Sequence, residues 1–144
     1  MWGWIGDAGD DLGDPVGGDT RYALCVYDTR GGDPVAAQLV MSTVIPPGRG
    51  WRMGADKLLA FIDCTGSNGG IKLIGITAPG VAPRKIVVEG SDDRLVLPPP
   101  AGGLLLAQNP RVSVQLVNSS GGCWQGVYDT PAMVSTPRLF WDIN

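Results

Sequence analysis

No histidine occurs anywhere in this sequence of 144 residues. Its absence removes Ser-His-Asp and Cys-His catalysis, HExxH zinc sites and the commonest general base. The segment GSNGG at 66–70 lacks the spacing of a nucleophile elbow, and GRGWRMG at 48–54 lacks the glycine spacing of a dinucleotide-binding loop. A phosphate-binding GxxxxGK[ST] loop is missing as well. These absences predict a protein that is not an enzyme.

Long apolar runs and dense basic clusters are also lacking. The most apolar stretch, LVLPPPAGGLLLA at 95–107, is interrupted by three consecutive prolines, so it is too short for a membrane span. Adjacent basic residues occur only at Arg84–Lys85, whereas nucleic-acid binders carry a basic stripe. We therefore expect no membrane span and no nucleic-acid partner.

Helix signals are nearly absent, because 22 glycines and 12 prolines interrupt the chain between short apolar runs. This pattern predicts an all-β fold, an antiparallel β-sandwich of the immunoglobulin-like or jelly-roll-like kind. Turns at Asn68–Gly69 and Gly121–Gly122 predict two hairpins, since these residues accept turn conformations. The predicted strands cover Tyr22–Asp28, Val35–Ile45, Leu58–Cys64, Ile71–Thr77, Lys85–Glu89, Arg94–Leu97, Leu104–Ala107, Val112–Asn118, Cys123–Tyr128 and Arg138–Trp141.

Large aromatic and acidic residues within these strands have two interpretations. Trp51, Trp124 and Trp141 could form a platform for a sugar, but large rings usually fill a sandwich core, which is the expectation for Trp51 and Trp124. Asp63 and Glu89 lie inside or at the end of apolar strands. A carboxylate pair can hydrolyse glycosides, yet strand-end residues that face solvent are the simpler expectation.

The first twenty residues contain five aspartates and no basic residue, whereas the rest of the chain has a small positive charge. We predict that residues 1–20 form an extended acidic arm and that residues 21–144 form one sandwich domain. A solvated tail is the alternative, because like charges resist ordering. Calcium prefers carboxylate and carbonyl oxygens, so the arm predicts a calcium site at Asp7, Asp10, Asp11 and Asp14. Trp2 and Trp4 alternate in the sequence and are the predicted anchors for assembly with another copy.

Five segments resemble an uncharacterised β-rich domain of long, predicted secreted proteins of environmental bacteria. They are LCVYD at 24–28, FIDCTGSNGGIKLIGI at 61–76, APRKIVVEG at 82–90, LVLPPP at 95–100 and VSVQLVNSSGGCWQGVY at 112–128. The resemblance covers about residues 21–130, and its most specific piece is VSVQLVNSSGGCWQ. It implies secretion, an all-β fold and a non-catalytic role, although the printed sequence does not open with a signal peptide.

The three cysteines, at positions 25, 64 and 123, allow one disulfide from three pairings. The resemblance favours a bridge between Cys25 and Cys123, and Cys64 has no counterpart in the domain that the chain resembles. A further cysteine is often found there at the position of Gly50. These departures leave the pairing open.

The expected function is a secreted structural subunit that associates with copies of itself, as in an extracellular filament, and that binds calcium at its arm. The alternative is an extracellular β-sandwich module that binds a glycan or another ligand. The most informative observation is whether residues 1–20 contact their own domain or another chain.

Overall fold

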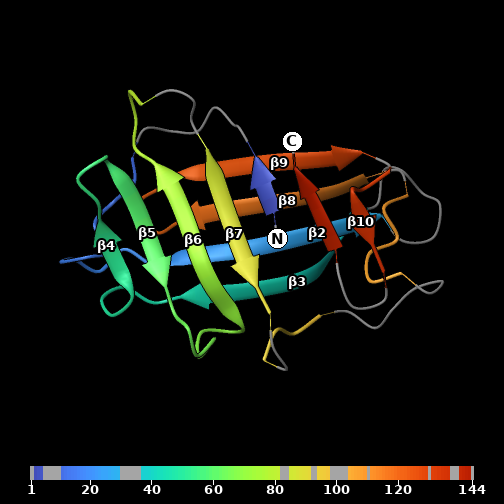
Figure 1. Ribbon diagram of the computed structural model, residues 1–144, viewed down its shortest axis with the longest axis horizontal. Coiled ribbons are helices and arrows are strands. Elements are labelled where there is room, and N and C mark those ends of the chain that lie inside the picture. Colours follow the sequence, from blue (N-terminus) through green and yellow to red (C-terminus); the bar gives the residue numbers. More distant parts are fainter. Residues whose placement is uncertain are drawn as a thin grey trace.

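The computed structural model describes residues 2–4, 11–29, 37–81, 85–91, 94–97, 104–109, 111–129, 131–136 and 140–143. These residues form two packed β-sheets and no helix, which confirms the predicted β-sandwich (Figure 1). They therefore include no helix that is long and apolar enough to span a membrane.

The larger sheet has seven strands in the order β10-β11-β1-β7-β6-β5-β4. Their bounds are β1 Trp2–Trp4, β4 Trp51–Met53, β5 Leu58–Ile62, β6 Ile71–Thr77, β7 Ile86–Gly90, β10 Val134–Ser135 and β11 Phe140–Ile143. The smaller sheet has four strands in the order β3-β2-β8-β9. Their bounds are β2 Tyr22–Thr29, β3 Ala37–Ile45, β8 Arg111–Asn118 and β9 Cys123–Asp129. All described pairings are antiparallel except that of β1 with β11.

Alternating side chains supply the core between the sheets. In β8, Val112, Val114 and Leu116 are fully buried, whereas Ser113 and Gln115 lie on the outer face. A strand points successive side chains to opposite faces, which accounts for this division. The larger sheet contributes Leu59, Phe61, Ile71, Ile74, Ile76, Ile86 and Val88, among others.

Two apolar segments that were predicted as strands have other structures. Residues 94–97 form a turn and bend, and Leu95 and Leu97 pack against the core from there. Residues 104–107 form a bridge and bends, with Leu105 and Leu106 buried. Both segments supply core side chains without joining a strand ladder. Their apolar composition therefore reflects burial in the core, and the prediction that they form strands was wrong.

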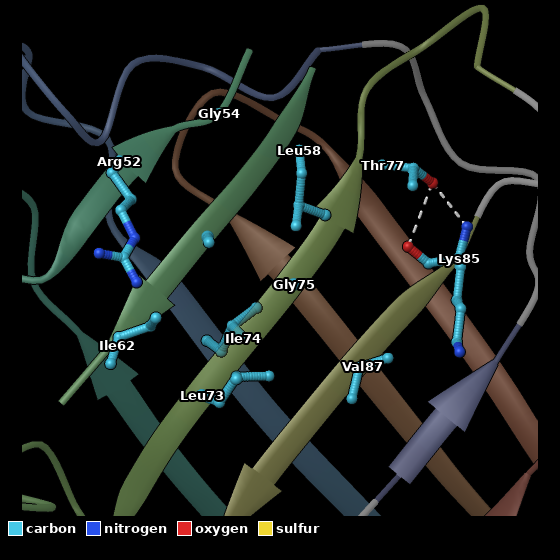
Figure 2. Close-up of a pocket in the computed structure, with 11 residues that line it drawn as sticks. Arg52, Gly54, Leu58, Ile62, Leu73, Ile74, Gly75, Thr77, Lys85 and Val87 are labelled. Carbon is cyan, nitrogen blue, oxygen red and sulfur yellow. Dashed lines mark hydrogen bonds between the residues drawn. The ribbon is translucent and has the colours of Figure 1, made fainter. Parts of the chain in front are cut away.

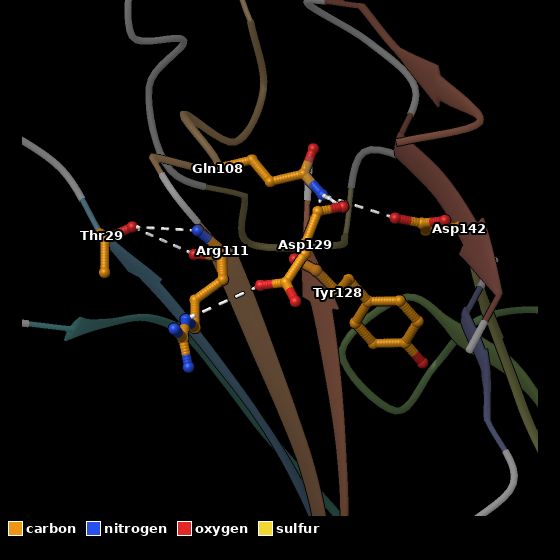
Figure 3. A network of polar contacts seen from close by, with 6 residues as sticks. All are labelled: Thr29, Gln108, Arg111, Tyr128, Asp129 and Asp142. Atoms are coloured by element: carbon orange, nitrogen blue, oxygen red, sulfur yellow. Dashed lines mark hydrogen bonds and ion pairs between the residues drawn. The ribbon is translucent and has the colours of Figure 1, made fainter. Parts of the chain in front are cut away.

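A buried carboxylate explains why the second segment does not pair as a strand. The carboxylate of Asp28 is fully buried and accepts hydrogen bonds from the backbone N–H groups of Ala107 (2.7 Å) and Gln108 (2.9 Å). The Gln108 side-chain amide donates to the carbonyl oxygens of Tyr128 (3.2 Å) and Asp129 (3.1 Å), next to Asp142 (Figure 3). Backbone donors that would serve a strand ladder are thus used by side chains, which fixes the segment across this end of the sandwich.

Candidate assembly surfaces

The arm is attached to its own domain. Strand β1 lies between β7 and β11, with Trp2 opposite Val88 and Trp4 opposite Ile86 (Figure 1). The backbone at the two predicted anchors, Trp2 and Trp4, is therefore an interior strand of this chain's own sheet. Trp–Gly–Trp, just before a run rich in glycine and aspartate, carries little strand signal in the sequence, and β1 exists because two neighbouring strands pair with it.

Residues 11–20 are held against the turn between β8 and β9. The Asn118 side-chain amide donates to the carbonyl oxygen of Asp11 (2.8 Å), and the Tyr22 hydroxyl donates to that of Leu12 (2.6 Å). The Thr20 hydroxyl lies 3.1 Å from that of Ser120 and accepts a hydrogen bond from the Asp14 backbone N–H. Uncharged polar groups of the domain thus hold this part of the arm by hydrogen bonds to its backbone.

The predicted calcium ligands divide into two groups. Asp7 and Asp10 lie outside the described residues. The Asp11 carboxylate accepts a hydrogen bond from the Gly13 N–H (2.8 Å), and the Asp14 carboxylate accepts from Val16 (3.1 Å) and Gly17 (2.8 Å), in each case through Oδ1. Within the described part of the chain, no three acidic or cysteine residues gather as a group that could hold a metal ion. Asp11 and Asp14 therefore act locally in fixing turns of the arm.

The predicted disulfide between Cys25 and Cys123 is absent, and all three cysteines are free. Cys25 lies in β2 opposite Gln115, whereas Cys123 lies in β9 opposite Val117. Strand β8 separates the two, and neighbouring strands are about 4.8 Å apart, so the Cα atoms are farther apart than a disulfide permits. The sequence did not reveal the strand that intervenes.

Two of the three tryptophans that could have formed a sugar platform are in the core, as expected. Trp51 and Trp124 are buried on either side of Tyr22, with ring centroids 4.6 Å and 6.0 Å from it. The Trp51 indole N–H donates to the carbonyl oxygen of Pro46 (2.9 Å). Trp141 is partly buried on β11. Because Trp51 and Trp124 are enclosed, they are not available to stack on a sugar.

Asp63 organises a loop beside a polar groove of about 580 Å³. Its carboxylate accepts hydrogen bonds from the hydroxyls of Thr65 (2.6 Å) and Ser67 (2.7 Å) and from the Asn68 side chain (3.1 Å). The hydrogen bonds from Thr65 and Ser67 hold the pKa of Asp63 well below its usual range. This carboxylate stays ionised and is occupied in fixing the turn, so it is poorly suited to act as a general acid. Glu89, on β7, is partly buried on the outer side of the larger sheet.

Strand β3 is an edge strand with little protection. Its nine residues, AQLVMSTVI, contain no charge and no proline, and Leu39 (54%) and Val44 (59%) are exposed. The other edge of this sheet, β9, carries Asp129, and the edges of the larger sheet, β4 and β10, have three and two residues. A shift of register opposite Val26 and Tyr27 marks a bulge, after which Met41–Ile45 pairs regularly with β2. Proteins usually guard a long edge with charge, proline or brevity, and this one has only the bulge.

The outer face of the larger sheet is apolar and forms a shallow groove of about 400 Å³ (Figure 2). Ala60 and Gly75 form its floor, and Leu58, Ile62 and Leu73 line it. Arg52 and Lys85 lie at opposite sides of the groove, on β4 and just before β7. Sequence reasoning missed this face, because an outward apolar residue in a short strand looks like a core residue until the register is known.

Comparison with known proteins adds no relative: no family model, curated protein or solved structure matches the chain. The function must therefore be inferred from the surfaces just described.

Proposed function

We propose that the protein is a non-catalytic structural subunit that associates with copies of itself through the β3 edge. The observation that carries the proposal is the combination of length, neutrality and exposure in β3. Unpaired backbone N–H and C=O groups along such an edge are a template for another strand. Antiparallel pairing of β3 with β3 of a second copy would extend the four-stranded sheet across the two molecules.

A location outside the cell is part of the proposal and rests on the resemblance to domains of secreted proteins. The glycan-binding alternative has weaker support, since Trp51 and Trp124 are buried. Strand addition needs only backbone groups and an uncharged surface, both of which β3 supplies.

Val44→Lys is expected to reduce self-association strongly. Val44 is exposed in the regular part of β3, so the new charge would face solvent in the monomer but would lie beside a neighbouring strand in the assembly. We expect the apparent dissociation constant of the assembly to rise about tenfold or more, measured by sedimentation velocity over a range of concentrations.

The matched control is Val96→Lys, which makes the same change at an exposed valine (75%) that lies outside any strand. It should leave both assembly and melting temperature nearly unchanged. If both variants assemble as the wild type does, β3 is not the interface and the proposed function loses its basis.

We also propose that calcium stabilises the arm, with Asp7 and Asp10 joined by the carboxylate oxygens that Asp11 and Asp14 do not use in their turns. A ligand present at a hundred times its dissociation constant stabilises the folded state by about 2.7 kcal/mol, which corresponds to a rise in melting temperature of about 5 °C or more. Calcium should produce this rise, and a chelator should reverse it.

Asp10→Asn/Asp11→Asn should abolish the calcium-dependent rise, because it removes two charges and keeps an oxygen at position 11 for the Gly13 N–H. Asp56→Asn, at an exposed aspartate outside the arm, is the control. Identical melting curves with calcium and with chelator in the wild type would mean that hydrogen bonds to the domain hold the arm without a cation.

A further inference from the structure

The outer face of the larger sheet has side chains in three rows that run across its strands. Register places Arg52, Ala60, Gly75 and Val87 in the middle row, with Arg52 at its β4 end. Leu58, Thr77 and Lys85 form the row on one side, where the Thr77 N–H donates to the Lys85 carbonyl oxygen (3.0 Å). Ile62, Leu73 and Glu89 form the row on the other side. Apart from Thr77, the uncharged members of these rows are apolar or glycine, which is unusual for a sheet face that no other layer of the described residues covers.

The smaller sheet packs on the opposite side of these strands, so β5, β6 and β7 form the front layer of the molecule (Figure 1). Figure 2 shows Leu58, Ile62, Leu73 and Val87 around the groove, with Lys85 at its margin. No ion pair joins Lys85 or Glu89 to another residue among those that the structure describes. The face is therefore apolar over β5 and β6, carries one charge of each sign on β7 and has Arg52 at its β4 margin.

We infer that this face packs against the same face of a second copy. The argument rests on charge complementarity along β7, where Lys85, Val87 and Glu89 point to the same side. A two-fold axis that crosses the strands at Val87 sets two β7 strands antiparallel, one above the other. Lys85 of each copy then lies opposite Glu89 of the other, so one contact of opposite charges forms on each side of the axis.

The apolar rows satisfy the same symmetry. Rotation about this axis exchanges the Leu58 row with the Ile62 row, so the bulky side chains of one copy face bulky side chains of the other across the groove. Stacked sheets lie about 10 Å apart and cross at about −30°, which lets the large residues interdigitate above the small floor of Ala60 and Gly75. A two-fold interface requires a self-complementary patch, and Lys85 opposite Glu89 meets that requirement on β7. Arg52 lies at the β4 margin, three strands from β7, where the long side chains of both copies extend into solvent.

This second surface adds a contact to the proposed self-association, and its biological role rests on that proposed function. The β3 edge belongs to the smaller sheet, and the apolar face belongs to the outer side of the larger sheet. Each surface joins two copies by its own two-fold axis. Copies that alternate the two contacts form an assembly larger than a dimer, which is an open filament where the two axes do not intersect.

Charge reversal in a protein whose edge contact is blocked tests the inference. With Val44→Lys present, the remaining face should still form a dimer in sedimentation equilibrium. Adding Lys85→Glu or Glu89→Lys should raise the dissociation constant of that dimer about tenfold or more, because each change places like charges at two symmetric positions. Combining both changes should restore the dimer, since the swapped pair is again complementary.

The control is Arg21→Glu, which reverses an exposed charge just before β2 and should leave the dimer intact. Melting curves for every variant separate unfolding from dissociation. The inference is overturned if the protein with Val44→Lys alone is a monomer at all concentrations, or if the swapped pair dissociates like the single reversals. A dimer that forms only when an apolar ligand or another protein is bound would also overturn it. Failure of the proposed edge contact has a separate result: assembly would then be the same in Val44→Lys as in the wild type.

Discussion

Gly70→Ala should lower the free energy of unfolding by about 3 kcal/mol. This is the largest effect that we expect from a substitution that only adds atoms. Gly70 adopts a φ of +79°, and a Cβ atom there would lie 2.5 Å from the backbone nitrogen of Leu95 and 2.7 Å from its Cα. The left-handed conformation costs an alanine about 1 kcal/mol, and the clash with a backbone atom adds a similar or larger cost because backbone cannot rotate away.

Gly80→Ala is the matched control for this prediction. Its φ is +82°, and nothing lies within 4 Å of the position that a Cβ atom would take. Both substitutions reduce the entropy of the unfolded chain equally, so the difference between them isolates the contact with Leu95. Chemical denaturation should show Gly80→Ala about 2 kcal/mol more stable than Gly70→Ala. Equal stabilities would mean that residues 94–97 do not press on the turn at Gly70.

The same contact shows why residues 94–97 were predicted as a strand and are not one. Arg–Leu–Val–Leu has strand-forming residues, but here Leu95 packs over Gly70, and the Arg94 guanidinium donates to the carbonyl oxygen of Thr65 (3.0 Å). This segment packs on a turn that lies more than twenty residues earlier in the sequence. Local propensity cannot reveal such a partner, because pairing depends on what the rest of the fold brings near.

Strands with regular alternation and a hairpin partner were predictable. Ile71–Thr77 has the predicted bounds, and the turn before it places Gly69 at φ +60° and Gly70 at +79°, as the Asn68–Gly69 signal indicated. Strand β4 was missed because three residues, Trp51–Met53, are too few to show a period of two. Strand β1 was missed for the different reason that its partners, β7 and β11, lie far away in the sequence.

The candidate surfaces could be predicted less well than the fold. The uncharged run at 37–45 is visible in the sequence, but only the strand order shows that β3 is an edge. Lys85, Val87 and Glu89 alternate visibly too, yet their partners across the sheet, including Gly75 and Leu73, follow from register. The acidic arm is the more conspicuous feature of the sequence, but the backbone of its described part pairs with its own domain, and the surfaces proposed for assembly lie on the sandwich.

The repeated motif VYDT at 26–29 and 127–130 illustrates how register decides meaning. In β2, Val26 and Asp28 are buried and Tyr27 faces outward, whereas in β9 Tyr128 is buried and Asp129 is exposed. The two copies of the motif therefore present opposite faces to the core. Their similarity is a coincidence of sequence and not a structural repeat.

Alkaline pH should release the arm through Tyr22. Its hydroxyl is buried and donates to the Leu12 carbonyl oxygen, and burial raises the pKa of Tyr22 to about 12. An unfolded tyrosine loses its proton near pH 10, so stability from this group is complete below pH 10 and is lost as the pH rises towards 12. The loss amounts to about 2–3 kcal/mol, to which Tyr128 adds, because burial and the negative charge of Asp142 raise the pKa of that hydroxyl as well.

Tyr22→Phe should cost about 1 kcal/mol at pH 7, where the hydrogen bond to Leu12 is lost, and should make the free energy of unfolding fall less steeply between pH 10 and 12. The curves of variant and wild type should therefore converge above pH 10 and cross before pH 12, because the wild type loses more than the variant's deficit of about 1 kcal/mol. Tyr128→Phe is the control, since it also removes a buried titrating hydroxyl but leaves the hydrogen bond from Tyr22 to Leu12 in place. Hydrogen exchange of the Gly18 and Thr20 amides, which donate to the Asp14 carbonyl oxygen, should become faster only in Tyr22→Phe. Equal exchange in both variants would show that Asn118 and Thr20 hold the arm without the Tyr22 hydroxyl.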